Sequence, residues 1–162
     1  MAEVYIALGS NLDQPHKQLD SALESLALHA DIDLIAVSSR YQTPPIGPQQ
    51  PDLINSAAKL GTDLSPEALL DALQAIEHQQ NRQRSVHWGP RTLDLDILLY
   101  DDLVLDTPRL TIPHALMTER AFVLVPLADL NSHLALPSGE TVIELLANCS
   151  QQGIVKLESG HL

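Results

Sequence analysis

The sequence has little cysteine, few aromatic residues and little positive charge. Among 162 residues Cys149 is the single cysteine, so no disulfide forms within the chain, and a reducing compartment is expected. No apolar run approaches the roughly 18 residues of a membrane helix, and no basic segment precedes an apolar one at the N-terminus. These absences predict a soluble, cytoplasmic protein, with one domain over residues 1–162 that is long enough to bury a core.

Positive charge is scarce overall but concentrated in one part of the chain. Nine Lys and Arg residues stand against 21 Asp and Glu residues, for a net charge of −12. This balance argues against binding nucleic acid or an anionic membrane. Five of the nine basic residues nevertheless lie between positions 82 and 120: Arg82, Arg84, Arg91, Arg109 and Arg120. A locally basic pocket that also holds divalent cations could therefore accept a polyanion such as ATP.

Apolar periodicity predicts the secondary structure. Strands are expected at residues 4–8, 33–43, 52–62 and 93–100, with shorter extended pieces at 104–105, 109–112 and 154–157. Helices are expected at 14–29, from a cap at Ser65 onward, from near Thr118 to Leu130, and at 141–147, and Pro126 should kink or break the third of these. The order β, α, β, β, α, β predicts an α+β fold, a single-domain sandwich compatible with a ferredoxin-like antiparallel sheet with packed helices.

The strand at 93–100 carries the most informative pattern. Period two places Asp94, Asp96 and Leu98 on one face, and Leu93, Leu95, Ile97 and Leu99 on the other. Two carboxylates with Cα atoms roughly 7 Å apart repel each other unless a cation lies between them. Mg²⁺ is often held by one or two carboxylates together with substrate phosphates. Cationic side chains precede the strand (Arg82, Arg84, His87 and Arg91), so the segment predicts chemistry on a nucleotide polyphosphate.

Each of these features also has a purely structural interpretation. Asp-Leu-Asp by itself is more often a solvated strand face, and Phe122 by itself is more often a core residue. The amide of Asn55 suits the edge of a heterocycle, but a structural hydrogen bond is equally consistent with its position. Gln74 and Glu77 lie on a polar helix stripe that leads to the arginine-bearing segment. The proline-rich residues 44–51 form either a surface connection or a wall of the site.

A longer string of residues resembles a known family. Residues 87–98, His-Trp-Gly-Pro-Arg-Thr-Leu-Asp-Leu-Asp-Ile-Leu, resemble the central signature of the 6-hydroxymethyl-7,8-dihydropterin pyrophosphokinases, enzymes of folate synthesis. Further matches are Gly9-Ser10-Asn11, residues 38–48, Asn55, Gln74, Glu77, residues 109–114, Arg120 and Phe122. The resemblance covers residues 3 to 137 and implies a ferredoxin-like α+β fold.

The resemblance implies a Mg²⁺-dependent diphosphotransferase that is active as a monomer. Its two substrates are ATP and 6-hydroxymethyl-7,8-dihydropterin; attack at the β-phosphorus gives AMP and the pterin diphosphate. Asp94 and Asp96 would hold two Mg²⁺ ions and, with Arg82 and Arg91, be catalytic. ATP would be bound by Gln74, Glu77, Arg82, Arg84, His87, Trp88, Arg91, Ile97, Arg109, Thr111, His114 and Arg120. Pterin would be bound by Thr43, Pro44, Pro45, Ile46, Leu53, Asn55, Trp88, Asp94, Asp96 and Phe122.

The sequence departs from the family pattern at three places. Leu53 stands where many relatives have a tyrosine that stacks on pterin, and Ala115 stands where an aromatic residue is common. The segment after Arg82 is slightly shorter, with Ser85-Val86-His87 where lysine or arginine is common, which predicts weaker or more pH-sensitive ATP binding through His87. An ATP Michaelis constant unaffected by His87→Ala across neutral pH would contradict this. The arginine-bearing and proline-rich segments are both expected to move to exclude water.

Two other classes of function compete with this interpretation. A metal-dependent phosphohydrolase acting on a nucleotide could use the same aspartates and arginines, although the sequence shows no further clustered carboxylate or histidine set. A non-catalytic ferredoxin-like binding module would leave the paired aspartates without a purpose. Taken without the resemblance, the residues lead only to a Mg²⁺-dependent, phosphate-handling α+β enzyme.

Overall fold

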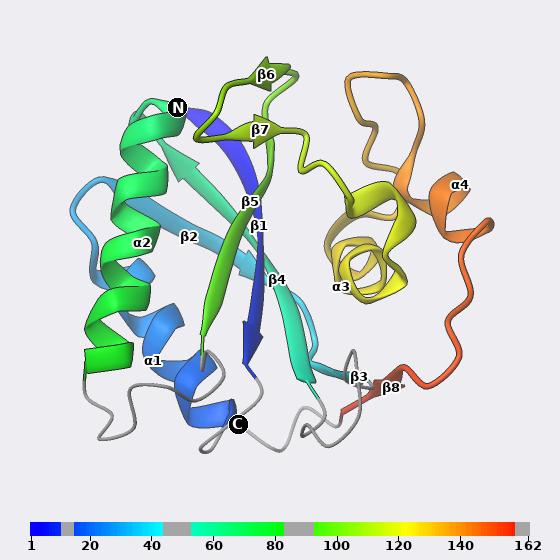
Figure 1. The fold of residues 1–162 in the computed structure, drawn as a ribbon, viewed down its shortest axis with the longest axis horizontal. Helices are drawn as coiled ribbons and strands as arrows, with labels where there is room; N and C mark the ends of the chain where they lie inside the picture. Colours follow the sequence, from blue (N-terminus) through cyan, green and yellow to red (C-terminus); the bar gives the residue numbers. More distant parts are fainter. Residues whose placement is uncertain (11–14, 44–52, 83–92, 158–162) are drawn as a thin grey trace.

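An antiparallel sheet forms the centre of the protein in the computed structural model, which describes residues 1–10, 15–43, 53–82 and 93–157, with the backbone alone at 81 and 82. Strand β1 (Ala2–Ser10) lies between β4 (Leu53–Thr62) and β5 (Asp94–Tyr100). Strands β2 (Ile32–Val37) and β3 (Tyr41–Thr43) both pair with β4, and β8 (Val155–Lys156) pairs with β3. Figure 1 shows the order, which confirms the ferredoxin-like α+β arrangement.

The single strand expected over residues 33–43 is wrong, because the segment is divided into β2 and β3. Ser38 forms two hydrogen bonds with Ala57 of β4: its N–H donates to the Ala57 carbonyl and its Oγ accepts from the Ala57 N–H, both at 2.8 Å. The buried Arg40 side chain then turns to helix α1 (Pro15–Leu28), where it pairs with Asp20, and its Nη1 lies 3.0 Å from Nδ1 of His16. These contacts interrupt the alternation of side chains between the two faces of the sheet, while β2 and β3 both remain paired with β4.

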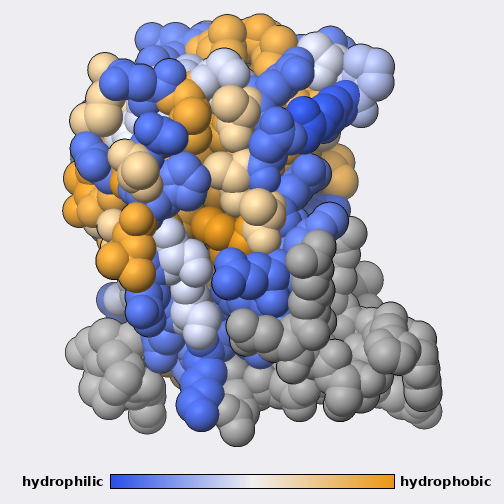
Figure 2. Space-filling view, turned by 90° about the vertical axis from the view of Figure 1, so that its left-hand side faces the viewer, coloured by the Kyte–Doolittle hydropathy of each residue, from blue (hydrophilic) through white to orange (hydrophobic). Residues whose placement is uncertain are grey.

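Two helices cover one face of the sheet, α1 (Pro15–Leu28) and α2 (Pro66–Arg82). Their apolar stripes, including Leu19 and Leu26 of α1 and Leu69 and Leu73 of α2, are fully buried against the sheet. The expected cap is present, since Ser65 Oγ accepts from the N–H of Ala68 at 3.2 Å. Figure 2 views this side of the molecule, where hydrophilic side chains surround smaller apolar patches. The periodicity of both helices is therefore confirmed.

The opposite face of the sheet packs against α3 (Ala121–Asn131), which follows a short 3₁₀ turn at Met117–Glu119. Helix α3 runs through Pro126, so of the two expected alternatives, a kink or a break at this proline, the break is wrong. Proline removes one backbone donor, and burial of Leu124 and Leu127 holds the helix in place around it. The short helix α4 (Val142–Leu146) begins at a capping box between Thr141 and Glu144.

A β-bulge changes the side-chain alternation of β5. Ile6 pairs with Ile97 and Tyr5 pairs with Leu99, so Leu98 has no partner of its own on β1. Leu99 consequently joins Leu98 in the apolar cluster beneath α3 instead of facing α1 and α2, which contradicts the predicted face for Leu99. The shorter pieces β6 (Leu105–Asp106) and β7 (Thr111–Ile112) pair with each other. None of the described helices has the length and apolarity to cross a membrane.

Candidate active site

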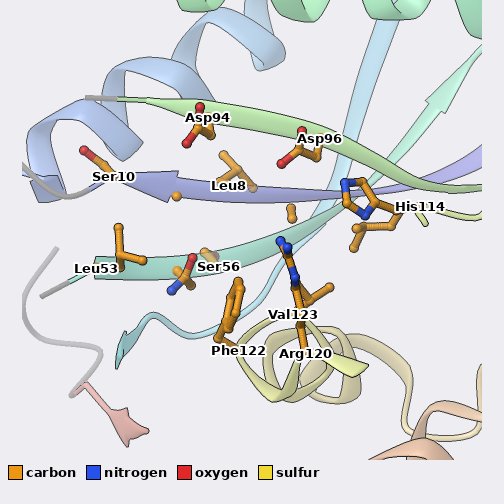
Figure 3. A pocket seen from close by; sticks show the side chains of 14 residues that line it. Leu8, Ser10, Leu53, Ser56, Asp94, Asp96, His114, Arg120, Phe122 and Val123 are labelled. Carbon is orange, nitrogen blue, oxygen red and sulfur yellow. The ribbon is translucent and has the colours of Figure 1, made fainter. Parts of the chain in front are cut away.

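A cavity of about 250 Å³ lies where the C-terminal half of β1 meets the first residues of β4, β5 and α3. Figure 3 shows its side chains converging from these elements. The cavity brings together seven residues that the sequence predicted for the site: Leu53, Asn55, Asp94, Asp96, His114, Arg120 and Phe122. They come from segments far apart in the chain, so the fold creates a common site from them.

Asp94 and Asp96 lie side by side along one face of β5 and are exposed toward the cavity (Figure 3). The predicted shared face of the two carboxylates is therefore confirmed. Within the described parts of the chain, no cluster of three or more His, Cys, Asp or Glu residues offers a complete set of metal ligands. A cation held here would take its remaining ligands from substrate oxygens and water. This donor set fits Mg²⁺, a hard ion that commonly keeps such ligands.

Glu77 supports β5 from the α2 side. The resemblance implies that Glu77 contributes to ATP binding, but its side chain is buried and its Oε2 accepts a hydrogen bond from the N–H of Leu95 at 2.7 Å. Leu95 lies between Asp94 and Asp96, on the terminal strand of the sheet. Glu77 therefore satisfies a backbone donor directly behind the two aspartates.

His114 is attached to the bulge of β5. Its N–H donates to the carbonyl of Leu98 at 3.0 Å, and its Nδ1 accepts from the N–H of Leu116 at 3.4 Å. Because Nδ1 accepts, the proton of the neutral ring lies on Nε2. Figure 3 shows the ring at the edge of the cavity, so His114 offers it a hydrogen-bond donor.

Arg120 and Phe122 approach the cavity together from the start of α3. The guanidinium carbon of Arg120 lies 5.6 Å from the centre of the Phe122 ring, within cation–π range. In Figure 3 the Arg120 side chain extends toward Asp96, and Phe122 faces the cavity beside it. A cationic group and an aromatic wall are thus held as a pair.

On β4, Asn55 is buried and its Nδ2 donates to Oγ1 of Thr43 at 2.7 Å. The structural hydrogen bond considered from sequence is therefore present, and Asn55 also lines the cavity. Leu53, two residues earlier on the same strand, lines the cavity beside it. The Thr43–Asn55 bond leaves the Asn55 carbonyl oxygen as the group that can accept from a ligand.

Five of the described residues that were predicted to bind the nucleotide lie apart from the cavity, and Glu77 is one of them. Arg109 pairs with Asp71 of α2 and lies 3.4 Å from Oε1 of Gln74. Thr111 is exposed in β7, and Ile97 is buried in the core beneath α1 and α2. Pro44, Pro45, Ile46, Arg84, His87, Trp88 and Arg91 lie outside the described residues, as does the Arg82 side chain.

Sequence reasoning missed part of the cavity lining. Ala7 and Ser56 were not singled out, and Gly9 was noted only as part of a motif, yet all three line the cavity. A signal for two of them exists in β1, where Tyr5, Ala7 and Gly9 share a face and decrease in size along the strand. The residues next to Ser56 in the sequence give no such signal. Its contact is with a distant residue, because its Oγ lies 3.0 Å from Oγ of Ser38, 18 residues earlier.

Comparison with known proteins gives consistent matches. The family described as 7,8-dihydro-6-hydroxymethylpterin-pyrophosphokinase (HPPK) matches residues 5–132. The 2-amino-4-hydroxy-6-hydroxymethyldihydropteridine pyrophosphokinase of Pseudomonas aeruginosa is 53% identical over 155 residues, covering 95% of this chain and 96% of that protein. Its namesake in Haemophilus influenzae is 48% identical over 158 residues, with coverages of 97% and 99%.

Solved structures share the fold at much lower identity. The wild-type Plasmodium falciparum HPPK-DHPS crystal structure matches with a TM-score of 0.69 and 14% identity, over 91% of this chain. This chain spans 43% of that longer chain. The A437G form of HPPK-DHPS from Plasmodium falciparum gives a TM-score of 0.73, also at 14% identity. At such identities the likeness shows the fold alone.

Proposed function

The chain belongs to the 7,8-dihydro-6-hydroxymethylpterin-pyrophosphokinase family, and we propose that the cavity between β1, β4, β5 and α3 is where it works. There it transfers pyrophosphate from ATP to 6-hydroxymethyl-7,8-dihydropterin in folate biosynthesis. This proposal is supported by the observation that groups suited to phosphate and groups suited to a heterocycle line the same cavity. Asp94, Asp96, His114 and Arg120 are the phosphate-handling groups, and Asn55, Leu53 and Phe122 are the heterocycle-binding groups.

On the phosphate side, Asp94 and Asp96 would hold two Mg²⁺ ions. When bound, Mg²⁺ supplies charge neutralisation at the phosphate oxygens and lowers the pKa of the attacking hydroxyl. Arg120 and the Nε2–H of His114 donate to phosphate oxygens where negative charge develops. Arg82 and Arg91, which the family resemblance adds as catalytic residues, would contribute further positive charge.

On the pterin side, Phe122 stacks against the planar ring and Leu53 packs as an apolar neighbour. The Asn55 carbonyl oxygen accepts from a ring N–H, because the Asn55 amide group is engaged by Thr43. Pro44, Pro45, Ile46 and Trp88 would complete this side. The ring is thereby oriented with its hydroxymethyl group toward β5.

The transfer forms a bond between the pterin hydroxyl oxygen and the β-phosphorus of ATP. The bond from that phosphorus to the oxygen bridging it to the α-phosphorus breaks, and AMP leaves with this oxygen. Asp96 faces the cavity and is the proposed acceptor of the hydroxyl proton. In-line geometry requires both substrates to be held at once, which a shared cavity provides.

The remaining nucleotide contacts belong to a second group of residues beside α2. Thr111 and the backbone near Ile97 are proposed to contact the adenine. Gln74, Arg84, His87, Trp88 and Arg109 are proposed to contact other parts of the nucleotide, and Glu77 is proposed to act on ATP binding through its bond to β5. Arg109 and Gln74 lie within 3.4 Å of each other, which supports a shared role. We further propose a single-domain monomer acting in the cytoplasm, with no nucleic-acid or membrane partner.

The test combines the purified protein with ATP, Mg²⁺ and 6-hydroxymethyl-7,8-dihydropterin and resolves all nucleotide products by chromatography. We expect AMP and the pterin diphosphate in equal amounts, lost in Asp96→Asn and retained in Asp102→Asn. Asp102 is a suitable control because it is an exposed carboxylate just beyond β5, outside this cavity.

Either alternative class gives a different result. A phosphohydrolase releases ADP or phosphate whether or not pterin is present. A binding module binds pterin without turning it over.

A further inference from the structure

The side chains of β1 that face the cavity end in a glycine that the backbone does not require. Gly9 lies inside the strand, and the described glycines with positive φ are Gly139 and Gly153, not Gly9. A glycine weakens the interior of a strand, and its presence there often marks a place where another group approaches closely. The presence of glycine at position 9 is therefore explained by the residues that pack against it and not by its backbone conformation.

The group that approaches Gly9 is the side chain of Asn55. Gly9 pairs with Asn55 of β4 on one side and with Asp94 of β5 on the other. A Cβ atom added at Gly9 would lie 3.1 Å from Oδ1 of Asn55. Among the described residues, the only other atom within 4 Å of that Cβ would be the carbonyl oxygen of Ile54, at 4.0 Å. The absence of a Cβ atom at Gly9 therefore leaves space for Oδ1 of Asn55.

Asn55 has little freedom to move away from such a methyl group. It is buried, and its Nδ2 donates to Thr43 Oγ1 at 2.7 Å. Thr43 is only 2% exposed, so it cannot follow a displaced amide without disturbing its own packing. A methyl group at position 9 would shift Asn55 Oδ1 or break its bond to Thr43.

We propose that Gly9 is a specificity-determining residue for the heterocyclic substrate. The absence of a side chain lets the Asn55 carbonyl oxygen lie over β1, where it accepts from an N–H on the edge of a planar fused ring. It also leaves the floor of the cavity clear between Asn55 and Asp94. Ala7, which pairs with Asp96, continues this low floor. The ring's hydroxymethyl arm crosses it to reach the carboxylates.

This inference rests on the proposed function and adds a residue that acts through Asn55 without supplying a functional group. The proposed role predicts different effects on the binding of the two substrates. A methyl group at Gly9 disturbs Asn55 and does not touch the Asp94 carboxylate. Pterin binding should therefore weaken while nucleotide binding stays the same.

The experiment measures two dissociation constants for Gly9→Ala by fluorescence and calorimetry. One is for 6-hydroxymethylpterin in the presence of Mg²⁺ and a non-hydrolysable ATP analogue, and the other is for the analogue with Mg²⁺ alone. We expect pterin affinity to fall about tenfold, the effect of losing one well-placed hydrogen bond. Nucleotide affinity should match wild type, which would also show that the variant is folded.

Gly61→Ala is the matched control, because Gly61 also lies within the sheet, in β4. A Cβ there would lie 3.2 Å from Ile35 Cδ1 and Met1 Cε, the ends of flexible side chains. This variant should bind pterin as wild type does. The double variant Gly9→Ala/Asn55→Ala should bind pterin no more weakly than Asn55→Ala, because Gly9 acts through Asn55.

Unchanged pterin binding in Gly9→Ala overturns the inference, as do additive losses in the double variant or equal losses for both substrates. Wild-type protein that fails to bind pterin at all would instead overturn the proposed function, and this inference with it. The two failures are thus distinguished by the wild-type measurement.

Discussion

The carboxylate of Glu77 accepts a hydrogen bond of 2.7 Å from the backbone N–H of Leu95, 18 residues further along the chain. This bond joins a buried residue of α2 to the terminal strand of the sheet, between the two aspartates that face the cavity. A buried carboxylate must be compensated by donors, and the strand supplies one. The position of Asp94 and Asp96 therefore depends on a residue behind them.

Replacing Glu77 should disturb both stability and activity. Glu77→Ala leaves the buried Leu95 N–H without this acceptor, and we expect a loss of about 1–3 kcal/mol in the free energy of unfolding. Glu77→Gln keeps an acceptor oxygen and should lose less. Urea unfolding and kcat for AMP formation measure the two effects. An alanine variant as stable as wild type would show that the bond contributes nothing.

The carboxylates of Asp94 and Asp96 should lower the stability of the protein without Mg²⁺ and should be needed for its activity. Without Mg²⁺, Asp96→Asn removes repulsion from Asp94, so the melting temperature should equal or exceed that of wild type. With Mg²⁺ and both substrates, kcat should fall on the order of 10²–10³-fold, equivalent to several kcal/mol of lost charge stabilisation. Thermal unfolding and product analysis test both statements. A variant that is both inactive and unstable without Mg²⁺ would point to a structural role instead.

The ring nitrogens of His114 should be distinguishable by substitution. Its Nδ1 accepts from the N–H of Leu116, which leaves Nε2–H as the proposed donor to phosphate. The amide nitrogen of glutamine can replace Nε2, whereas that of asparagine is placed closer to Nδ1. We therefore expect His114→Gln to retain more kcat/KM for ATP than His114→Asn. Equal activity of the two variants would contradict the assigned direction of the ring.

Phe122 should influence nucleotide binding as well as pterin binding. Its ring lies 5.6 Å from the Arg120 guanidinium, and cation–π pairs of this kind contribute about 0.5–1 kcal/mol at exposed sites. Phe122→Leu should weaken binding of the ATP analogue roughly two- to fivefold in the absence of pterin. Calorimetry without pterin isolates this effect. Leu53→Ala, which changes the wall away from Arg120, should leave it unaffected.

Tyr41 should make the protein sensitive to alkali. Burial, followed by the hydrogen bond with Asp129, raises the pKa of Tyr41 above its ordinary value of 10.0. The folded state therefore keeps the proton at pH values where the unfolded chain releases it. This contribution to stability is complete below pH 10.0 and is lost as the pH rises above that value.

The Tyr41→Phe variant removes this titration. The free energy of unfolding should consequently fall less steeply for this variant between pH about 9 and pH about 11. Urea unfolding across that range provides the measurement. Tyr100→Phe is a useful comparison, because burial also raises the pKa of Tyr100, so each variant should remove part of the slope. Identical slopes for wild type and Tyr41→Phe would refute the prediction.

The sequence by itself determined the features that depend on neighbouring residues. Period two places Asp94 and Asp96 on one face of a strand, and helical periodicity identifies the buried stripes of α1 and α2. The cap at Ser65 and the order of strands and helices were also readable. The assignment of residues to ATP or to pterin came from the family resemblance. Periodicity shows which face of an element a side chain occupies, but not what that side chain binds.

Tertiary structure decided whatever depends on contacts between distant segments. Leu99 changes face because β5 bulges against β1, and the strand at 33–43 divides because Arg40 turns to Asp20 of α1. Glu77 meets Leu95, and Gly9 meets Asn55, only when separate elements pack together. Local patterns arise from the geometry of a few successive residues, whereas these contacts depend on the register and packing of the assembled sheet.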